Sequence, residues 1–161
     1  MKILVTVGSM TEKKFTRLFK IIDELCDEGV FNNSQIMTQV GFENYKSDNF
    51  QCFDMIAEGD FKNIIDNSDL IITHAGTGTV ISSIKKGKKV IIFPRMAKFD
   101  EHYDDHQLEL ADLFTEQGYV LQAKDKEELK SCINHLDKFI PAPFKSNNER
   151  MNKLIIDFIE R

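Results

Sequence analysis

The strongest constraint on the fold is a pair of short apolar runs, Leu70–Ile72 and Val90–Phe93, with a glycine-rich loop and a helical pattern between them. Apolar residues recur at helical spacing from Val80 to Ile84, and Gly87 ends that pattern just before the second run. Such a segment predicts a strand, a helix and a second strand. Two strands joined in this way pair in parallel through a right-handed crossover. We therefore expect an α/β fold with a Rossmann-like parallel sheet flanked by helices.

The rest of the chain continues this alternation. Four further apolar runs are predicted to be strands: Ile3–Val7, Gln35–Val40, Phe50–Phe53 and Tyr119–Leu121. The first helix is predicted to begin at a capping box of Ser9 and Glu12, and Asp125 is predicted to cap a later helix. A last helix is expected from about Asn147, with apolar residues at Met151, Leu154, Ile155, Phe158 and Ile159. Since no repeat or linker interrupts the pattern, we expect residues 1–161 to form a single domain.

Composition narrows the class of protein. A net charge of −5 argues against sequence-independent nucleic-acid binding, and a hydrophobic content of 42% is typical of soluble globular domains. No apolar run approaches the roughly 18 residues of a membrane span, and Met1 leads into a strand and not into a signal peptide. We therefore expect a cytoplasmic protein. The scattered Cys26, Cys52 and Cys132 predict buried or half-buried thiols, with neither a disulfide framework nor a zinc site.

The loop at residues 73–79 is a candidate anion site. In open parallel sheets ligands bind beyond the carboxyl ends of the strands, where helix N-termini offer unpaired backbone N–H groups. Gly76 and Gly78 would permit positive φ and close approach of an anion, while Thr77 and Thr79 would cap the helix or contact a phosphate. Alternatively, the glycines only form a tight turn and Thr79 only caps the helix. The loop matches neither a Walker A motif nor a complete dinucleotide fingerprint.

A second polar loop follows the run that ends at Phe93. Pro94 and Arg95 lead into the polar segment 98–107, which opens a helix carrying Leu108, Leu110, Ala111, Leu113 and Phe114. Ordering so many polar groups at a strand exit is costly without a ligand. Because its guanidinium is always charged, Arg95 is expected to assist a phosphate held at the glycine loop.

Two histidines in this loop raise the question of a metal site. His102 and His106 are four residues apart and lie among Glu101, Asp104 and Asp105. Carboxylates at the start of a helix are common because they suit the helix dipole, and a loop gives these side chains no assured common face. We therefore expect no metal and no other cofactor.

Three segments resemble the nucleotide-sugar-binding half of GT-B glycosyltransferases: THAGTGT, KKGKKVIIFPR and EHYDDHQLELAD. The segments 5–9 and 38–41 match the same pattern, so the resemblance spans nearly the whole chain. The likeness is greatest to the small subunits of split enzymes. These are the bacterial capsular and exopolysaccharide transferase subunits, and the cytosolic catalytic subunit of the eukaryotic transferase that adds the second GlcNAc to dolichol-linked sugar.

The resemblance implies a single GT-B half-domain that binds a UDP-sugar. The donor nucleotide and diphosphate would be bound by Gly8, Ser9, Gln39, Gly41, His74, Gly76, Thr77, Gly78, Thr79 and Arg95. The sugar would be bound by Glu101, His102, Asp105, His106 and Gln107, with Gln107 the strongest candidate because an amide both donates and accepts. Judged by its chemistry alone, Gln39 is equally well explained as a partly exposed strand residue, and His74 as a structural histidine. Many relatives carry a ribose-binding glutamate where this chain has Ser82 and Ser83.

The resemblance also implies a partner, because a full GT-B enzyme has two such domains and this chain resembles only the C-terminal one. We expect transfer of a hexose or N-acetylhexosamine from a UDP-sugar to a lipid-linked polysaccharide precursor. The catalytic base would lie on a membrane-associated partner subunit, which would recruit this chain to the inner face of the cell membrane. The last helix would dock on that partner or pack on its own sheet. The alternatives are a non-enzymatic α/β regulatory domain that senses a nucleotide or sugar phosphate, and half of a nucleotide-sugar epimerase ancestor.

Overall fold

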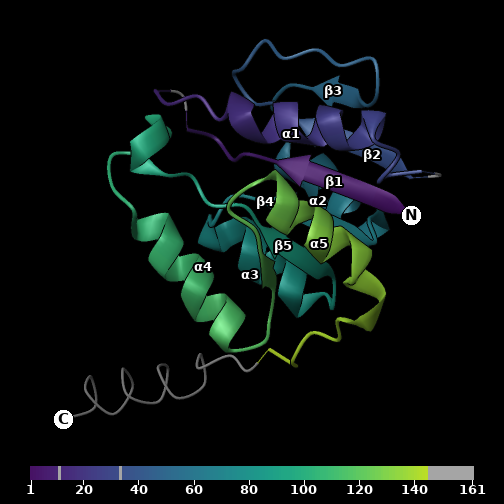
Figure 1. The fold of residues 1–161 in the computed structure, drawn as a ribbon, viewed down its shortest axis with the longest axis vertical. Coiled ribbons are helices and arrows are strands. Elements are labelled where there is room, and N and C mark those ends of the chain that lie inside the picture. The colour runs from purple at the N-terminus through teal and green to yellow at the C-terminus, as the bar shows by residue number, and fades with distance from the viewer. Residues whose placement is uncertain (11, 33, 145–161) are drawn as a thin grey trace.

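Residues 1–10, 12–32 and 34–144 are described by the computed structural model, and their strands form one parallel sheet (Figure 1). The strand order is β3-β2-β1-β4-β5-β6. The strands are β1 (Lys2–Thr6), β2 (Gln35–Gln39), β3 (Gln51–Phe53), β4 (Leu70–Thr73), β5 (Lys89–Ile92) and β6 (Leu121–Gln122). The helices are α1 (Thr16–Asp27), α2 (Glu58–Asn67), α3 (Thr77–Lys85), α4 (His106–Glu116) and α5 (Lys126–Asn134), with short 3-10 turns at Ala97–Phe99 and Leu136–Lys138.

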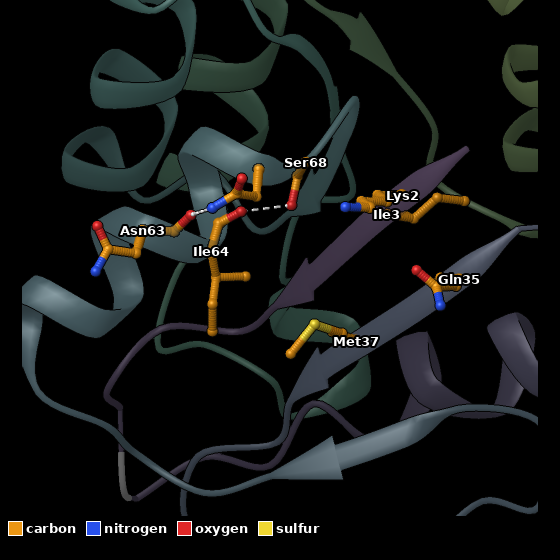
Figure 2. A pocket seen from close by; sticks show the side chains of 8 residues that line it. Lys2, Ile3, Gln35, Met37, Asn63, Ile64 and Ser68 are labelled. Atoms are coloured by element: carbon orange, nitrogen blue, oxygen red, sulfur yellow. Dashed lines mark hydrogen bonds between the residues drawn. The ribbon is translucent and has the colours of Figure 1, made fainter.

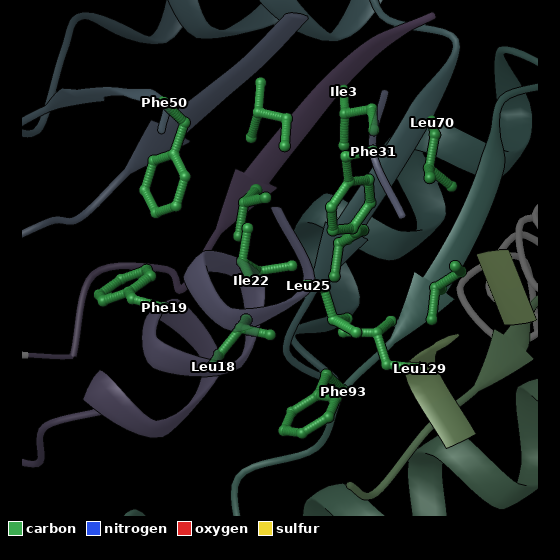
Figure 3. Close-up of a cluster of buried hydrophobic side chains, with 14 of the residues drawn as sticks. Ile3, Leu18, Phe19, Ile22, Leu25, Phe31, Phe50, Leu70, Phe93 and Leu129 are labelled. Atoms are coloured by element: carbon green, nitrogen blue, oxygen red, sulfur yellow. The ribbon is translucent and has the colours of Figure 1, made fainter. Parts of the chain in front are cut away.

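Helices cover both faces of the sheet because successive strand residues point to opposite sides. Ile3 and Val5 face one cluster of buried side chains, which includes Leu18, Ile22 and Leu25 of α1 and Leu129 of α5 (Figure 3). Leu4 faces the other cluster, to which α2, α3 and α4 contribute Ile65, Val80, Ile84, Ala111 and Phe114. The predicted α/β architecture, a single parallel sheet flanked by helices, is confirmed.

The strand order reverses between β1 and β4. The chain leaves β1 for β2 through α1 on one face, and it leaves β4 for β5 through α3 on the other face. The two strands are paired directly, with Thr6 opposite Thr73 at their carboxyl ends. Ligands of doubly wound sheets bind at such a point, because the connections diverge there and leave a crevice.

The start of α1 differs from the prediction. The helix begins at Thr16, and Ser9 and Glu12 lie exposed in the preceding loop, so the predicted capping box is wrong. The carboxylate of Glu43, from the loop between β2 and β3, accepts hydrogen bonds from the Phe15 N–H and the Thr16 hydroxyl. A side chain distant in sequence therefore takes the role that we assigned to Ser9.

Most other boundaries agree with the sequence pattern. The Asp125 side chain accepts from the Glu128 N–H and caps α5, as predicted. The sixth strand begins at Leu121, two residues later than the start expected at Tyr119. The helix expected from about Asn147 lies outside the described residues.

Candidate functional site

Three loops meet at the carboxyl edge of the sheet because β1, β4 and β5 are neighbours running in the same direction. The first loop follows β1 and contains Gly8 and Ser9. The second connects β4 to α3 and contains the residues from His74 to Gly76. The third connects β5 to α4 and runs through residues 93–105. All three belong to the predicted donor site.

The imidazole of His74 lies between two glycine backbones. A Cβ on Gly8 would come 2.5 Å from His74 Cε1, and a Cβ on Gly76 would come 2.3 Å from His74 Nε2. Gly8 also has a φ of 75° and Gly41, the corresponding residue after β2, has a φ of 64°, both in the region that favours glycine. Gly76 has a φ of −69°, so the expectation of positive φ is wrong there, and contact with His74 explains the glycine instead.

His74 is kept neutral by its surroundings. Burial of the ring and the nearby positive charges of Arg95 and His102 lower the pKa of His74 from the ordinary 6.5 to about 4, against the opposing effect of a hydrogen bond with the Thr6 backbone. At neutral pH the ring therefore carries one N–H donor and one acceptor nitrogen. Because that N–H donates to the Thr6 backbone, the other nitrogen is left to accept a hydrogen bond from a ligand hydroxyl without a charge on the ring.

The N-terminus of α3 opens beside His74. Gly76 is the N-cap and, among the described residues, no side chain caps this end of the helix. Thr79 therefore does not cap α3; its carbonyl accepts from the Ser82 and Ser83 hydroxyls. Thr77 and Gly78 are exposed, and a Cβ on Gly78 would have no atom within 4 Å. The N–H groups of the first turn have no intrahelical partners, so this end can accept an anion.

Gln107 holds the exits of β4 and β5 together. Its Oε1 accepts from the Ala75 N–H at 3.4 Å and from the Arg95 N–H at 3.0 Å, and the side chain is buried. The prediction that this amide both donates to and accepts from a sugar needs correction, because its oxygen is already bonded to the backbone. Only the amide nitrogen remains for a ligand.

The surroundings of Arg95 and Glu101 do not fit the roles predicted for them, which were phosphate binding and sugar binding. The Arg95 side chain is 1% exposed, and its guanidinium donates to the carbonyl oxygens of Val7, Lys13 and Glu101. Glu101 is 3% exposed, and its carboxylate accepts from Arg17 and from the Met96 N–H. Arg95 therefore does not reach a phosphate, and Glu101 does not reach a sugar, because both are committed to contacts inside the protein.

The other predicted sugar residues lie at the surface of the third loop. His102 is partly exposed, with its Nδ1 2.9 Å from Asp104 Oδ1. Asp105 and His106 are exposed, and Asp105 Oδ1 accepts from the Ala97 N–H. In the loop after β1 Ser9 is exposed, whereas Gln39 at the end of β2 is buried and accepts from the Thr6 hydroxyl at 2.8 Å. Gln39 is thus a packed strand residue instead of an open wall of the cleft.

Two functional candidates were absent from the sequence prediction. Arg17 lies on α1 and reaches the third loop through Glu101. Lys13 forms an ion pair with Asp100 and lies 5.2 Å from the centre of the Tyr103 ring. No spacing in the sequence relates positions this far apart, so neither residue could have been assigned to the loop from local pattern.

Other features bear on metals, thiols and membranes. The described part of the chain contains no group of three or more His, Cys, Asp or Glu side chains suited to hold a metal ion, and none of its helices is long and apolar enough to cross a membrane. Cys26, Cys52 and Cys132 are free and half-buried, as predicted. Burial raises the pKa of Cys26 to about 11, which disfavours its reactive thiolate.

A hollow of about 270 Å³ lies at the opposite, amino edge of the sheet (Figure 2). It is lined by Lys2, Ile3, Gln35, Met37, Asn63, Ile64, Asn67 and Ser68. The polar groups of Asn67 and Ser68 donate to carbonyls of their own helix, and Lys2 is the one ionisable lining residue. The hollow therefore lacks the convergent donors that a diphosphate needs.

Replacing Gly76 with alanine should destabilise the protein by about 1–3 kcal/mol, because the new methyl group overlaps the confined His74 ring. Gly59→Ala is the control, since Gly59 lies in the first turn of α2 and a Cβ there would have no atom within 4 Å. Urea unfolding of both variants measures the difference. Equal stability of Gly76→Ala and wild type would contradict the described packing.

His74 should also make stability depend on pH. The unfolded chain takes up a proton near pH 6.5 and the folded one only near pH 4, so stability falls as pH falls through that window, by on the order of 3 kcal/mol in total. His74→Asn should remove this contribution, whereas His135→Asn, at an exposed position, should leave it. If the unfolding free energy of His74→Asn depends on pH in the same way as that of wild type, His74 is not the source of the pH dependence.

The fold is similar to that of known glycosyltransferase structures. The solution structure of ALG13 superposes with a TM-score of 0.62 at 24% identity, over 92% of each chain. The crystal structure of MurG from Acinetobacter baumannii gives a TM-score of 0.52 at 19% identity, over 85% of this chain and 40% of MurG. At these identities the two structures establish the fold.

The sequence is also similar to those of ALG13 proteins. The UDP-N-acetylglucosamine transferase subunit ALG13 of Candida albicans is 32% identical over 71% of this chain, and that of Saccharomyces cerevisiae is 34% identical over 60%. The matches span only 36% and 46% of those relatives' own lengths. The model of the glycosyltransferase family 28 C-terminal domain matches residues 2–160, and the chain therefore belongs to that family.

Proposed function

We propose that this chain is the donor-binding subunit of a glycosyltransferase that uses UDP-N-acetylglucosamine. The observation that carries the proposal is the open N-terminus of α3, set beside a neutral His74 at the point where the strand order reverses. Relatives named as UDP-N-acetylglucosamine transferase subunits favour this sugar. The comparisons give no support to the narrower expectation of a capsular or exopolysaccharide enzyme.

In this proposal the diphosphate binds at the first turn of α3. The N–H groups of Thr77, Gly78 and Thr79 and the positive end of the helix dipole face the phosphate oxygens. The neutral His74 beside them adds no charge, and its one N–H is directed to the Thr6 backbone. The N–H groups and the helix dipole favour the transition state, because negative charge grows on the β-phosphate as its bond to the sugar C1 breaks.

The sugar is proposed to lie against the third loop. Of the residues predicted to bind the sugar, His102, Asp105, His106 and the amide nitrogen of Gln107 remain available there. The acceptor hydroxyl oxygen forms the new bond to C1, and its proton passes to a base. We assign that base to a partner subunit, as the sequence resemblance suggests.

The partner and acceptor are also proposals. The relatives are named as subunits, which favours a second chain that completes the enzyme. We propose that this partner is membrane-associated, brings a lipid-linked acceptor and recruits the chain to the cytoplasmic face of the membrane. Ser82 takes the position of the ribose-binding glutamate, but its hydroxyl already donates to the Thr79 carbonyl at 3.0 Å. We therefore expect the nucleoside to contribute less affinity than the diphosphate.

Gly78→Ala is the most direct test of the anion site. The methyl group meets open space in the protein, so the fold should be retained, but it projects where the diphosphate approaches the helix. We expect the Kd for UDP, measured by titration calorimetry, to rise at least about tenfold, or about 1.4 kcal/mol. Gly59→Ala, at the same position of α2, should leave the Kd unchanged.

Two results would count against the proposal. Unchanged UDP affinity in Gly78→Ala would mean that the anion does not bind at the N-terminus of α3. Binding of UDP-N-acetylglucosamine without any transfer, in the presence of the partner and acceptor, would favour instead a non-enzymatic domain that senses a nucleotide or sugar phosphate.

A further inference from the structure

Three charged side chains meet beneath the third loop: Arg17 from α1, and Arg95 and Glu101 from the loop itself. All three are well shielded, since Arg95 and Glu101 are buried and the Arg17 side chain is 18% exposed. None of them is available to the donor in the proposed function. We therefore infer their role from the parts of the protein that they contact.

Arg17 and Glu101 form a two-point contact. Arg17 Nε lies 2.7 Å from Glu101 Oε1, and Arg17 Nη2 lies 2.8 Å from Glu101 Oε2. Arg17 also donates to the carbonyls of Lys124 and Pro94. Its guanidinium carbon is 4.6 Å from the centre of the Phe93 ring and 4.5 Å from that of Phe99. The planar fork thus fixes Glu101 in both direction and distance.

Glu101 passes this constraint to the loop. Its Oε2 accepts from the Met96 N–H at 3.1 Å, which closes the loop on itself across five residues. The carbonyl of Glu101 accepts from Arg95 Nη1, which also reaches the Lys13 carbonyl, while Arg95 Nη2 reaches the Val7 carbonyl. The third loop is therefore tied to α1 by Arg17 and to the end of β1 by Arg95.

Anchoring a loop with buried charges is not required for stability. Replacing a buried ion pair with well-packed apolar residues is often neutral or stabilising, because desolvation offsets the attraction. What a bidentate pair supplies is a defined geometry. The residue directly after Glu101 is His102, and Asp105 and His106 follow in the same loop, so the position of Glu101 sets the position of the polar groups assigned to the sugar.

We propose that Arg17 and Glu101 are positioning residues that set the preference of the site for a sugar-carrying nucleotide over the bare nucleotide. The inference rests on the proposed function, and it assigns selectivity for the sugar to residues that do not touch it. Arg95 shares the network, but it also holds Val7 next to Gly8, so its loss would disturb both halves of the site. Arg17 and Glu101 act on the sugar half alone.

Glu101→Gln and Arg17→Lys test this inference. The first keeps the shape of the side chain and an acceptor for Met96 but removes the charge, and the second keeps the charge but removes the fork. Titration calorimetry with UDP and with UDP-N-acetylglucosamine gives the ratio of the two Kd values. We expect each variant to lower the preference for the sugar nucleotide at least about fivefold while the Kd for UDP stays within about twofold.

Glu28→Gln is the matched control, because Glu28 forms exposed ion pairs with Lys126 and Lys130 directly after the same helix. It should change neither Kd. Equal weakening of both ligands in Glu101→Gln and Arg17→Lys would overturn the inference, since a purely structural role predicts that result. An unchanged ratio in both variants would also overturn it. Failure of the wild-type chain to bind UDP would refute the proposed function itself. This result differs from the two outcomes above, in which wild type binds UDP and only the inference about Arg17 and Glu101 fails.

Discussion

The contact of the His74 ring with the backbones of Gly8 and Gly76 is the constraint on which the site depends. The exits of β1 and β4 accommodate the imidazole between them only because neither glycine carries a Cβ. The same contact desolvates the ring and keeps it neutral. It also leaves the first turn of α3 without a side-chain cap among the described residues, so that backbone N–H groups face the crevice where the strand order reverses.

The charged residues around this contact order the third loop. A polar loop at a strand exit is costly to order, and a bound ligand is one means of ordering it. In this structure Arg17, Arg95 and Glu101 order the third loop from within, by bonding to its backbone and to each other. Gln107 does the same for the exits of β4 and β5. The loop is thus arranged before any ligand arrives, which lowers the entropic cost of binding.

How far the sequence predicts this structure depends on the range of the interactions. The strands predicted at Leu70–Ile72 and Val90–Phe93, the helix between them and the Asp125 cap follow from local pattern, and the structure has them within one residue at each strand end. The start of α1 was not, because Glu43 reaches it from another loop. Arg95 and Glu101 were assigned to ligands because their chemistry suits phosphate and sugar, but the same chemistry suits carbonyls and an arginine. Only the fold reveals which partners are within reach.

The central claim, that an anion binds at the open end of α3, is tested most directly by NMR. A ¹⁵N-labelled sample titrated with UDP reports the binding position through amide chemical-shift changes. We expect the largest changes at Thr77, Gly78 and Thr79, with smaller ones at Gly8. Changes centred on the hollow at the amino edge, at Gln35, Asn63 and Asn67, would contradict it.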